Sequence, residues 1–281
     1  MFKISFDKIR LVEIEIFSYC NRRCWFCPNS FIDRNSENIL MDENVYLKML
    51  NDLKSINFSG MISWSRYNEP LSHREVFLTR LKQTKELLTN ATLHTNTNGD
   101  YLTKDYLDDI YDAGLRSLNI QCYLKEDEEF NTENIKQKIE NMAHKLELKY
   151  FVTCDTFHRY EVEFEYKVRM NLKMYARDFR VDGNNRGGSL KIIESKIRNA
   201  PCFLPCTDIY IDYNGKVMPC CNFRSDIKEH QKFILGDVNA NSILNIFNNK
   251  KAQNLRKILS RAKIEFHPCN ECDFAIGHEY E

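Results

Sequence analysis

Hydrophobic residues recur at two periods along the first 185 residues, and the two periods alternate. Residues 11–17 read Leu-Val-Glu-Ile-Glu-Ile-Phe, with an apolar side chain at nearly every second position, which is typical of a strand. Residues 42–53 instead carry apolar side chains at helical spacing. The same patterns predict further strands at 61–66, 91–95, 117–123, 147–154 and 178–181, and helices at 74–88, 104–111, 131–144 and 161–175.

Alternating strands and helices predict a mostly parallel sheet with the helices outside it. Six such units occupy about 185 residues, whereas an eight-stranded barrel would need a longer chain. We therefore predict an α/β fold of the six-stranded partial (β/α)6 barrel type. Its ligand site is expected at the carboxyl ends of the strands.

The pattern changes after residue 185. Residues 208–212 and 216–218 read as strands on either side of Tyr213-Asn214-Gly215, and Asn-Gly is a strong hairpin-turn signal. Helices are predicted at 242–247 and 251–261. This part is too small for a large core and holds six cysteines, so a bound metal would explain its stability. The predicted domains are 1–185 and 186–281, the second being a small auxiliary domain.

Charge and hydropathy exclude several classes of partner. The 40 basic and 40 acidic residues give a formal net charge of zero, so no long-range attraction to nucleic acid or anionic lipid is expected. No apolar run approaches the roughly 20 residues that a membrane span requires. The first residues lack the apolar core of a signal peptide. We expect a cytoplasmic protein without nucleic-acid or membrane partners.

The chain contains eleven cysteines, and in a reducing cytoplasm clustered cysteines point to metal or redox chemistry. Three of them stand at Cys20, Cys24 and Cys27, directly after the first predicted strand. A zinc site closed by this loop would need a fourth ligand, and none lies beside it. Three cysteines instead leave one iron of a [4Fe–4S] cluster without a protein ligand. A structural zinc knuckle is the alternative interpretation.

The spacing C-x3-C-x2-C, with the aromatic Phe26 before the third cysteine, resembles the signature of the radical S-adenosylmethionine (SAM) superfamily. The resemblance implies that Cys20, Cys24 and Cys27 bind a [4Fe–4S] cluster, that this cluster binds SAM, and that a flavodoxin or ferredoxin-type protein donates the electron. Each of the segments described next could alternatively be an ordinary surface turn.

Three later segments resemble the SAM-binding motifs of this superfamily. Tyr67-Asn68-Glu69-Pro70 stands where the family has a Gly-Gly-Glu type segment, and Glu69 would accept from the methionine ammonium. This chain departs from the family at Asn68, which replaces a glycine. Thr97-Asn98-Gly99-Asp100 is similar to the family's Thr-Asn-Gly turn, which makes Asn98 a cofactor-binding candidate. Gln121 ends a strand where family members contact the ribose or the substrate.

The C-terminal cysteines resemble the auxiliary-cluster extensions of these enzymes, known as twitch or SPASM domains. The similarity is greatest to members that oxidise an aminocyclitol, and it implies a second [4Fe–4S] cluster held by Cys202, Cys220, Cys269 and Cys272. Cys206 and Cys221 are then surplus. A four-cysteine zinc site is the alternative.

Asn185-Arg186-Gly187-Gly188 places two of nine glycines in one turn at the predicted domain junction. Arg186 could bind the cofactor carboxylate or the substrate. The alternative is a glycine-rich hinge with a solvated arginine.

The resemblance implies an enzyme that cleaves SAM reductively and takes a hydrogen atom from a small polyol, aminocyclitol or sugar. The expected outcome is oxidation of an alcohol to a ketone, with the auxiliary cluster as electron acceptor. A base is needed, and the sequence offers only His94, Asp155 and Arg186 as candidates.

Other functions remain open at this point. In an epimerase a thiol would return hydrogen to the substrate. Cys221 is the first candidate for that thiol, followed by Cys206, Cys122 and Cys154. Modification of a ribosomal peptide is a further alternative. A non-catalytic zinc or iron–sulfur module is the alternative from another class of protein.

Overall fold

The computed structural model describes residues 3–191, 197–272 and 274, so the end of the predicted second domain lies outside the described residues. One ten-stranded sheet runs through it in the order β10-β9-β8-β1-β2-β3-β4-β7-β6-β5. The strands are β1 (Leu11–Ile14), β2 (Met61–Ser63), β3 (Thr92–Thr97), β4 (Ser117–Gln121), β5 (Tyr150–Asp155), β6 (Arg159–Phe164), β7 (Asn171–Arg177), β8 (Asp208–Ile211), β9 (Lys216–Met218) and β10 (Gly236–Asp237). The helices are α1 (Glu43–Ser55), α2 (Arg74–Leu87), α3 (Lys104–Asp112), α4 (Thr132–Leu146), α5 (Phe179–Asp182), α6 (Leu204–Thr207), α7 (Ile243–Phe247) and α8 (Lys250–Leu259).

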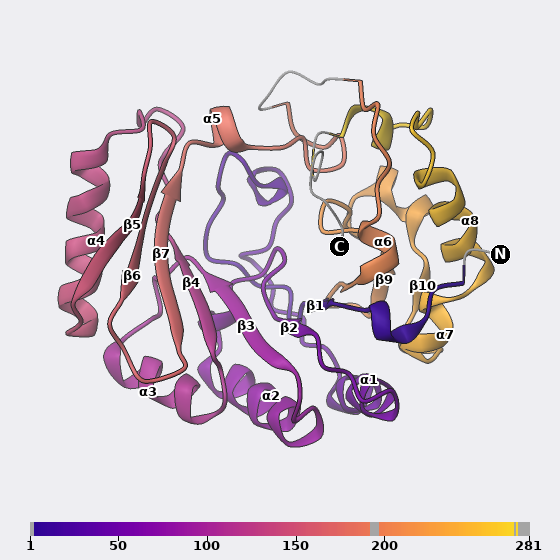
Figure 1. Ribbon diagram of the computed structural model, residues 1–281, viewed down its shortest axis with the longest axis horizontal. Coiled ribbons are helices and arrows are strands. Elements are labelled where there is room, and N and C mark those ends of the chain that lie inside the picture. The colour runs from indigo at the N-terminus through magenta and orange to yellow at the C-terminus, as the bar shows by residue number, and fades with distance from the viewer. Residues whose placement is uncertain (1–2, 192–196, 273, 275–281) are drawn as a thin grey trace.

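Six neighbouring strands run parallel, in the order β8-β1-β2-β3-β4-β7. Figure 1 shows that the sheet is curved, with α2, α3 and α4 on its outer side and the loop after β1 inside the curve. The predicted α/β class, a partial barrel with a C-terminal extension, is confirmed. Because parallel strands end at one edge, the segments that follow β1, β2, β3 and β4 meet in the same region.

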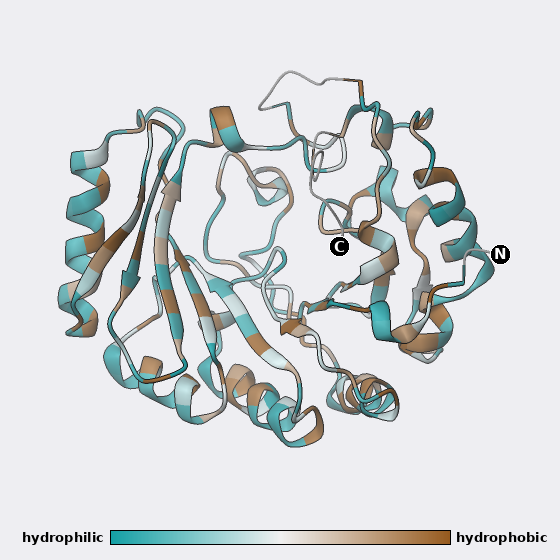
Figure 2. Ribbon diagram, in the orientation of Figure 1, coloured by the Kyte–Doolittle hydropathy of each residue, from teal (hydrophilic) through white to brown (hydrophobic). Residues whose placement is uncertain are grey.

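Hydrophobic periodicity explains the elements that surround the site. On β1 the side chains of Val12 and Ile14 are fully buried, whereas Glu13 alternates to the inner side of the curve. Helix α1 begins at an N-cap, Asp42, whose carboxylate accepts from two backbone N–H groups of the first turn. Figure 2 shows brown bands alternating with teal and white along β4 and β7, as expected for strands covered by helices on one face only.

Two predicted elements are wrong. The stretch 161–175, predicted as a helix, forms most of the antiparallel hairpin β6–β7. Its buried side chains alternate along β7, and the pairing of β7 with β4 and of β6 with β5 decides between the two periods. The stretch 178–181, predicted as a strand, lies mostly in the single helical turn α5, which Asp178 caps.

These corrections change how the parallel sheet is completed. After α4 the chain goes to the edge strand β5 and returns through β6, so that β7 takes the place beside β4. On the other side β8, from the C-terminal part, pairs in parallel with β1. The six parallel strands therefore include one strand from beyond residue 185.

The predicted C-terminal elements are confirmed. β8 and β9 form the hairpin, and Gly215 has a φ of +80° in its turn. α7 and α8 follow within two residues of their predicted limits. The domain boundary at residue 185 stays a prediction, since the sheet continues across it. Within the described residues, no helix has both the length and the apolar character needed to cross a membrane.

Candidate active site

The first cysteine motif lies on the loop after β1, and hydrogen bonds fix this loop to the ends of β2 and β3. Asn29 Nδ2 donates to Tyr67 O at 2.8 Å, beyond β2. Asn98 Nδ2, beyond β3, donates to Asn21 Oδ1 at 2.8 Å. Asn21 Nδ2 in turn donates to Asp100 Oδ2 at 2.7 Å. The loop is therefore held over the carboxyl edge of the sheet.

The three thiols of this loop line one cavity of about 90 Å³. The pKa of both Cys20 and Cys24 is raised to about 12, chiefly by burial and in part by repulsion between their thiolates and that of Cys27. A cation that binds thiolates would relieve this cost.

Glu69 faces the same cavity from the end of β2. Its Oε1 accepts from Leu71 N at 3.1 Å and from Thr97 Oγ1 at 2.5 Å, and its Oε2 accepts from Asn98 N at 2.8 Å. Burial raises the pKa of Glu69 to about 7, although these three donors lower it. A buried carboxylate in this position is suited to accept from an ammonium group.

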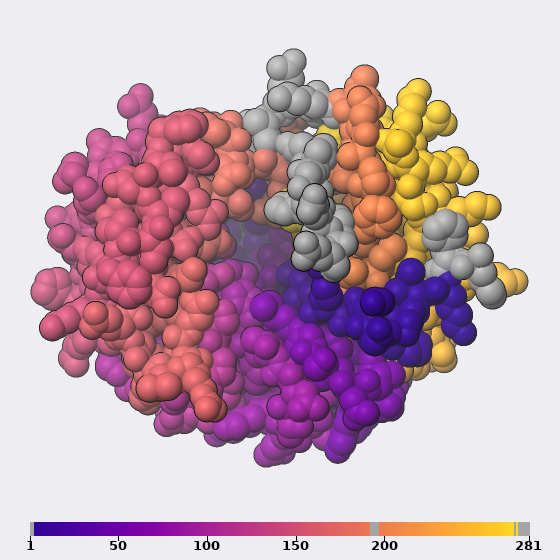
Figure 3. Space-filling view, viewed as in Figure 1, coloured from indigo at the N-terminus to yellow at the C-terminus, as the bar shows by residue number. Residues whose placement is uncertain are grey.

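A second cavity of about 180 Å³ adjoins the first and reaches deeper toward the strand ends. The residues that line both cavities are Phe26, Arg66, Asn68, Glu69, Asn98, Tyr123 and Arg186. The residues that line the second one alone are Glu13, Ser65, Asn96, Thr97, Gln121, Arg177, Phe179 and Cys221. We call this second cavity the polar cavity, because most of these side chains form hydrogen bonds or carry charge. Figure 3 shows a hollow at the centre of the molecule's face, between the β5–β7 strands and the C-terminal part.

An aromatic wall closes one side of the polar cavity. Phe26 stacks on Phe179 with ring centroids 3.5 Å apart and an angle of 2° between the planes. Tyr123 lies against Phe26 at 5.0 Å. Such a wall offers flat apolar surface next to the polar groups.

Three arginines, Arg66, Arg177 and Arg186, give the polar cavity positive charge. Arg66 is fully buried, and its Nε and Nη1 have no hydrogen-bond partner among the described residues. Arg186 lines both cavities, and no carboxylate in the described part of the chain forms an ion pair with it. Its backbone φ is +47°, in the turn that the sequence places before Gly187 and Gly188. Donors that are buried without partners point to an anionic or hydroxylated ligand.

Four other thiols line a separate, largely apolar cavity in the C-terminal part: Cys202, Cys220, Cys269 and Cys272. Cys221 lines the polar cavity instead, so the adjacent cysteines 220 and 221 face different cavities. Cys206 lines neither cavity. Among the described residues, no three His, Cys, Asp or Glu side chains come close enough to share a single metal ion. Thiols spread around a cavity suit a cluster in which each thiolate binds its own iron.

Comparison with known families agrees with both cysteine sites. Residues 14–122 match the radical SAM superfamily, and residues 202–273 match SPASM, an iron-sulfur cluster-binding domain. The chain therefore contains a radical SAM domain followed by a SPASM domain.

Similar proteins extend this comparison to nearly the whole chain. It is 26% identical to the S-adenosyl-L-methionine-dependent 2-deoxy-scyllo-inosamine dehydrogenase of Niallia circulans, over 98% of each chain. It is 30% identical to the GTP 3',8-cyclase of Campylobacter jejuni, over 40% of this chain and 34% of the cyclase. The crystal structure of BtrN in complex with AdoMet and 2-DOIA matches with a TM-score of 0.67 and 23% identity, over 95% of this chain and 94% of that one. This last likeness shows the shared fold.

The two domain matches and the full-length relative confirm the predicted radical SAM enzyme and its cofactors, and set aside the non-catalytic module. The radical SAM domain implies a [4Fe–4S] cluster and SAM, and the SPASM domain implies auxiliary iron–sulfur binding rather than zinc. The two sets of thiols fit these groups. The expected oxidoreductase class agrees with the name of the full-length relative.

The predicted site residues fall into two groups. Every predicted ligand, cofactor-binding or catalytic residue lines one of the three cavities. The three-thiol cavity and the adjoining polar cavity hold Cys20, Cys24, Phe26, Cys27, Glu69, Asn98, Gln121, Arg186 and Cys221, and the C-terminal cavity holds Cys202, Cys220, Cys269 and Cys272. Their roles remain predictions. His94, Asp155, Cys122, Cys154 and Cys206 line neither the polar cavity nor the thiol cavities.

Several residues of the polar cavity are not among those predicted from the sequence, chiefly Glu13, Arg66 and Arg177. A signal for Glu13 existed, because two glutamates on one face of an otherwise apolar strand are unusual for a buried sheet. Arg66 and Arg177 follow or end strands without any motif that marks them.

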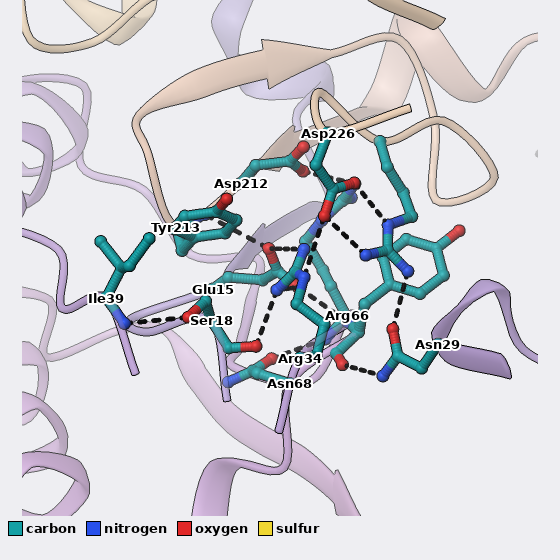
Figure 4. A network of polar contacts seen from close by, with 12 residues as sticks. Glu15, Ser18, Asn29, Arg34, Ile39, Arg66, Asn68, Asp212, Tyr213 and Asp226 are labelled. Atoms are coloured by element: carbon teal, nitrogen blue, oxygen red, sulfur yellow. Dashed lines mark hydrogen bonds and ion pairs between the residues drawn. The ribbon is translucent and has the colours of Figure 1, made fainter. Parts of the chain in front are cut away.

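A buried network of charges joins the cysteine loop to the C-terminal part (Figure 4). Arg34, on the loop, stands 3.5 Å from Glu15 of the β1 segment and donates to Asp226 Oδ2 at 2.9 Å. Arg66 Nη2 lies 2.8 Å from Asp212 Oδ1, beyond β8. Attraction between these buried opposite charges therefore holds the cysteine loop, which carries the first thiol site, against the C-terminal part, which carries the second.

Proposed function

We propose that this enzyme oxidises a secondary alcohol of a small aminocyclitol, polyol or sugar to a ketone. One observation carries the proposal: the polar cavity lies between the two thiol sites. It adjoins the three-thiol cavity, and it is also lined by Cys221, whose neighbour Cys220 lines the four-thiol cavity. Similarity over nearly the whole chain to a 2-deoxy-scyllo-inosamine dehydrogenase supports this choice of reaction.

The proposal assigns the groups as follows. Cys20, Cys24 and Cys27 would hold the cluster that binds SAM, and the four thiols of the second cavity would hold the auxiliary cluster. When bound, these groups supply the 5′-deoxyadenosyl radical that takes a hydrogen atom from the substrate, and the acceptor for the electron that remains.

The chain's own residues bind and orient the reactants. Glu69 accepts from the methionine ammonium, and Arg186, with no ion-pair partner of its own among the described carboxylates, binds the methionine carboxylate. Gln121 and Asn96 offer amide groups to substrate hydroxyls in the polar cavity. The aromatic wall excludes water from that side.

The test is anaerobic turnover of the reconstituted enzyme with SAM, dithionite and 2-deoxy-scyllo-inosamine as first probe. We expect 5′-deoxyadenosine and a ketone from the unmodified enzyme. Cys24→Ala is expected to form neither, and Cys269→Ala is expected to form 5′-deoxyadenosine with little ketone. Equal 5′-deoxyadenosine formation by the unmodified enzyme and Cys24→Ala would contradict the assignment of the first site.

Epimerisation is a second candidate, because the Cys221 thiol lines the polar cavity. A thiol there would return hydrogen to the substrate carbon, and that hydrogen would exchange with solvent. In deuterium oxide an epimerase yields product with carbon-bound deuterium and no ketone. Oxidation yields the ketone, and Cys221→Ala leaves its yield unchanged.

We also propose a flavodoxin or ferredoxin as the physiological electron donor and the cytoplasm as the compartment. Apart from Cys272, the cysteines of the described part of the chain form no disulfide bonds, as suits a reducing compartment. Reduced flavodoxin should replace dithionite in the turnover assay.

A further inference from the structure

Glu13 occupies a central position in the polar cavity. It lies on β1, the strand between β2 and β8, and its side chain is 14% exposed. The other inward carboxylate of this segment, Glu15, is engaged by backbone donors from Tyr67 at 3.0 Å and Tyr213 at 3.2 Å and by Arg34. Glu13 lines the cavity and Glu15 does not.

The Glu13 carboxylate is not committed to the protein. Among the described residues it accepts no hydrogen bond, and its nearest charged group is Arg66 Nη1 at 3.7 Å. Arg66 stands closer to Asp212, at 2.8 Å, so its charge is shared between the two carboxylates. The acceptor capacity of Glu13 is thus left for a molecule in the cavity.

The other carboxylates near the cavity are already engaged. Glu69 accepts three hydrogen bonds, and Asp212 accepts from Ser225 N besides its pair with Arg66. His94 bonds to Ser117 and does not line the cavity. A base that acts on a ligand hydroxyl has to reach it, and this requirement favours Glu13.

We propose that Glu13 is the catalytic base that takes the hydroxyl proton of the substrate. The inference rests on the proposed oxidation. The substrate's C–H bond breaks and its hydrogen atom goes to the 5′-deoxyadenosyl radical; the O–H bond breaks and its proton goes to Glu13. The remaining electron leaves for an iron–sulfur acceptor of the auxiliary type as the C=O bond forms. The substrate thereby loses two electrons and two protons in all.

The charges around Glu13 support proton transfer near neutral pH. Burial raises the pKa of Glu13 to about 7, because the carboxylate loses its hydration. Arg66 and Arg186 lower this pKa, whereas Asp208 and Glu15 raise it. Tyr210 of β8 and the thiol of Cys221 also face Glu13, and burial keeps both of them neutral. A base with a pKa close to the working pH is efficient.

The decisive variant is Glu13→Gln, assayed with 2-deoxy-scyllo-inosamine deuterated at the reacting carbon. Substrate affinity, measured by calorimetry on the reconstituted enzyme with SAM and no reductant, is expected to stay within about threefold. Deuterium is expected to reach 5′-deoxyadenosine as before. Ketone formation is expected to fall by about 100-fold or more, the usual contribution of a general base. Circular dichroism checks that the variant is folded.

The pH profile gives a readout that a structural role would not move. In the unmodified enzyme kcat is expected to rise with pH through about 7, as Glu13 loses its proton. Glu13→Asp should keep this rise with a lower plateau, and Glu13→Gln should abolish it. The pH profile of the unmodified enzyme remains a test if the glutamine variant does not fold.

Three results would overturn the proposal. Joint loss of substrate binding and deuterium transfer in Glu13→Gln would make Glu13 a recognition residue. Ketone formation by Glu13→Gln at the rate of the unmodified enzyme would show that Glu13 is not the base. A rise of kcat with pH in Glu13→Gln like that of the unmodified enzyme would show the same. Failure of the proposed function differs from these, because then the unmodified enzyme itself forms no ketone, and the role of Glu13 as base falls with it.

Discussion

At the scale of single residues, Cys220 and Cys221 show how one backbone step separates two functions. The two residues lie in the turn after β9, in which Phe223 N donates to Cys220 O at 3.2 Å, so their side chains diverge. Cys220 therefore lines the cavity with three other thiols, while Cys221 lines the polar cavity beside Glu13. The pair of adjacent cysteines, ambiguous in the sequence, is resolved by the direction of each side chain.

This arrangement predicts different iron contents for two matched variants. Cys220→Ser should lose about four irons per chain, the content of one [4Fe–4S] cluster. Cys221→Ser should keep its iron, because its thiol faces away from the second site. Iron and sulfide analysis of the anaerobically reconstituted proteins measures both. Iron loss in Cys221→Ser with retention in Cys220→Ser would reverse the ligand assignment.

The raised pKa of Glu13 also predicts how the free energy of unfolding depends on pH. Its pKa rises from 4.5 to about 7 on folding, so the folded protein keeps this proton over a pH range in which the unfolded chain loses it. The stabilising contribution is complete below pH 4.5 and is lost as the pH rises through about 7; it is on the order of 3 kcal/mol.

In Glu13→Gln, the decline of the free energy of unfolding between about pH 5 and pH 7 should therefore be shallower than in the unmodified protein. Urea unfolding at a series of pH values measures it. Parallel curves for the two proteins would show that Glu13 does not hold its proton in the folded state.

At the scale of elements, the turn at residues 186–188 is the connection on which the site depends most. It carries Arg186 into both cavities, and Gly187 has a φ of +67°. A Cβ on Gly187 would stand 2.8 Å from Asn222 O, a backbone atom that cannot move aside easily. Glycine is needed here for its backbone conformation and for the close approach of the 222 segment.

Gly187→Ala is accordingly expected to reduce the free energy of unfolding by about 1–2 kcal/mol, or more if the contact with Asn222 adds to the backbone cost. Gly183→Ala is the matched control, because Gly183 has a φ of −88°, which alanine adopts without strain. Chemical denaturation compares them. A smaller loss in Gly187→Ala than in Gly183→Ala would contradict the role of this turn.

At the scale of the whole molecule, the buried charges bind the C-terminal part to the barrel strands. The side chain of Arg34 is 3% exposed and that of Glu15 is fully buried, while Asp226 comes from the segment that follows Cys221. Removing one partner leaves an uncompensated charge inside the protein. Because the network joins the two parts of the chain that carry the cysteine sites, we expect these parts to unfold together.

Arg34→Met should lower the free energy of unfolding by about 3–5 kcal/mol. Arg74→Met is the control, since Arg74 pairs with Asp105 and Asp109 on the surface and should lose less than about 1 kcal/mol. Both are measured by urea denaturation at neutral pH. Equal losses in the two variants would mean that the internal network adds no more than a surface pair.

The elements with strong periodicity, the cysteine spacing and the family resemblance could all be predicted without a structure. Local information suffices for these: Val12 and Ile14 alternate whatever lies beside them, and three cysteines on one short loop are close in any fold. Tertiary structure decided what depends on neighbours. Residues 161–175 became strands because β4 and β5 offered hydrogen-bond partners to a segment whose periodicity fits either structure.

The same distinction holds at the site. The motifs pointed to Glu69 and Asn98, but Glu13, Arg66 and Arg177 carry no motif and converge only when the strands lie side by side. β8, from beyond residue 185, supplies the sixth parallel strand, and the charged loop after it neutralises part of Arg66. A buried carboxylate owes its proton affinity to the surrounding charges and to lost hydration, and both exist only in the folded chain.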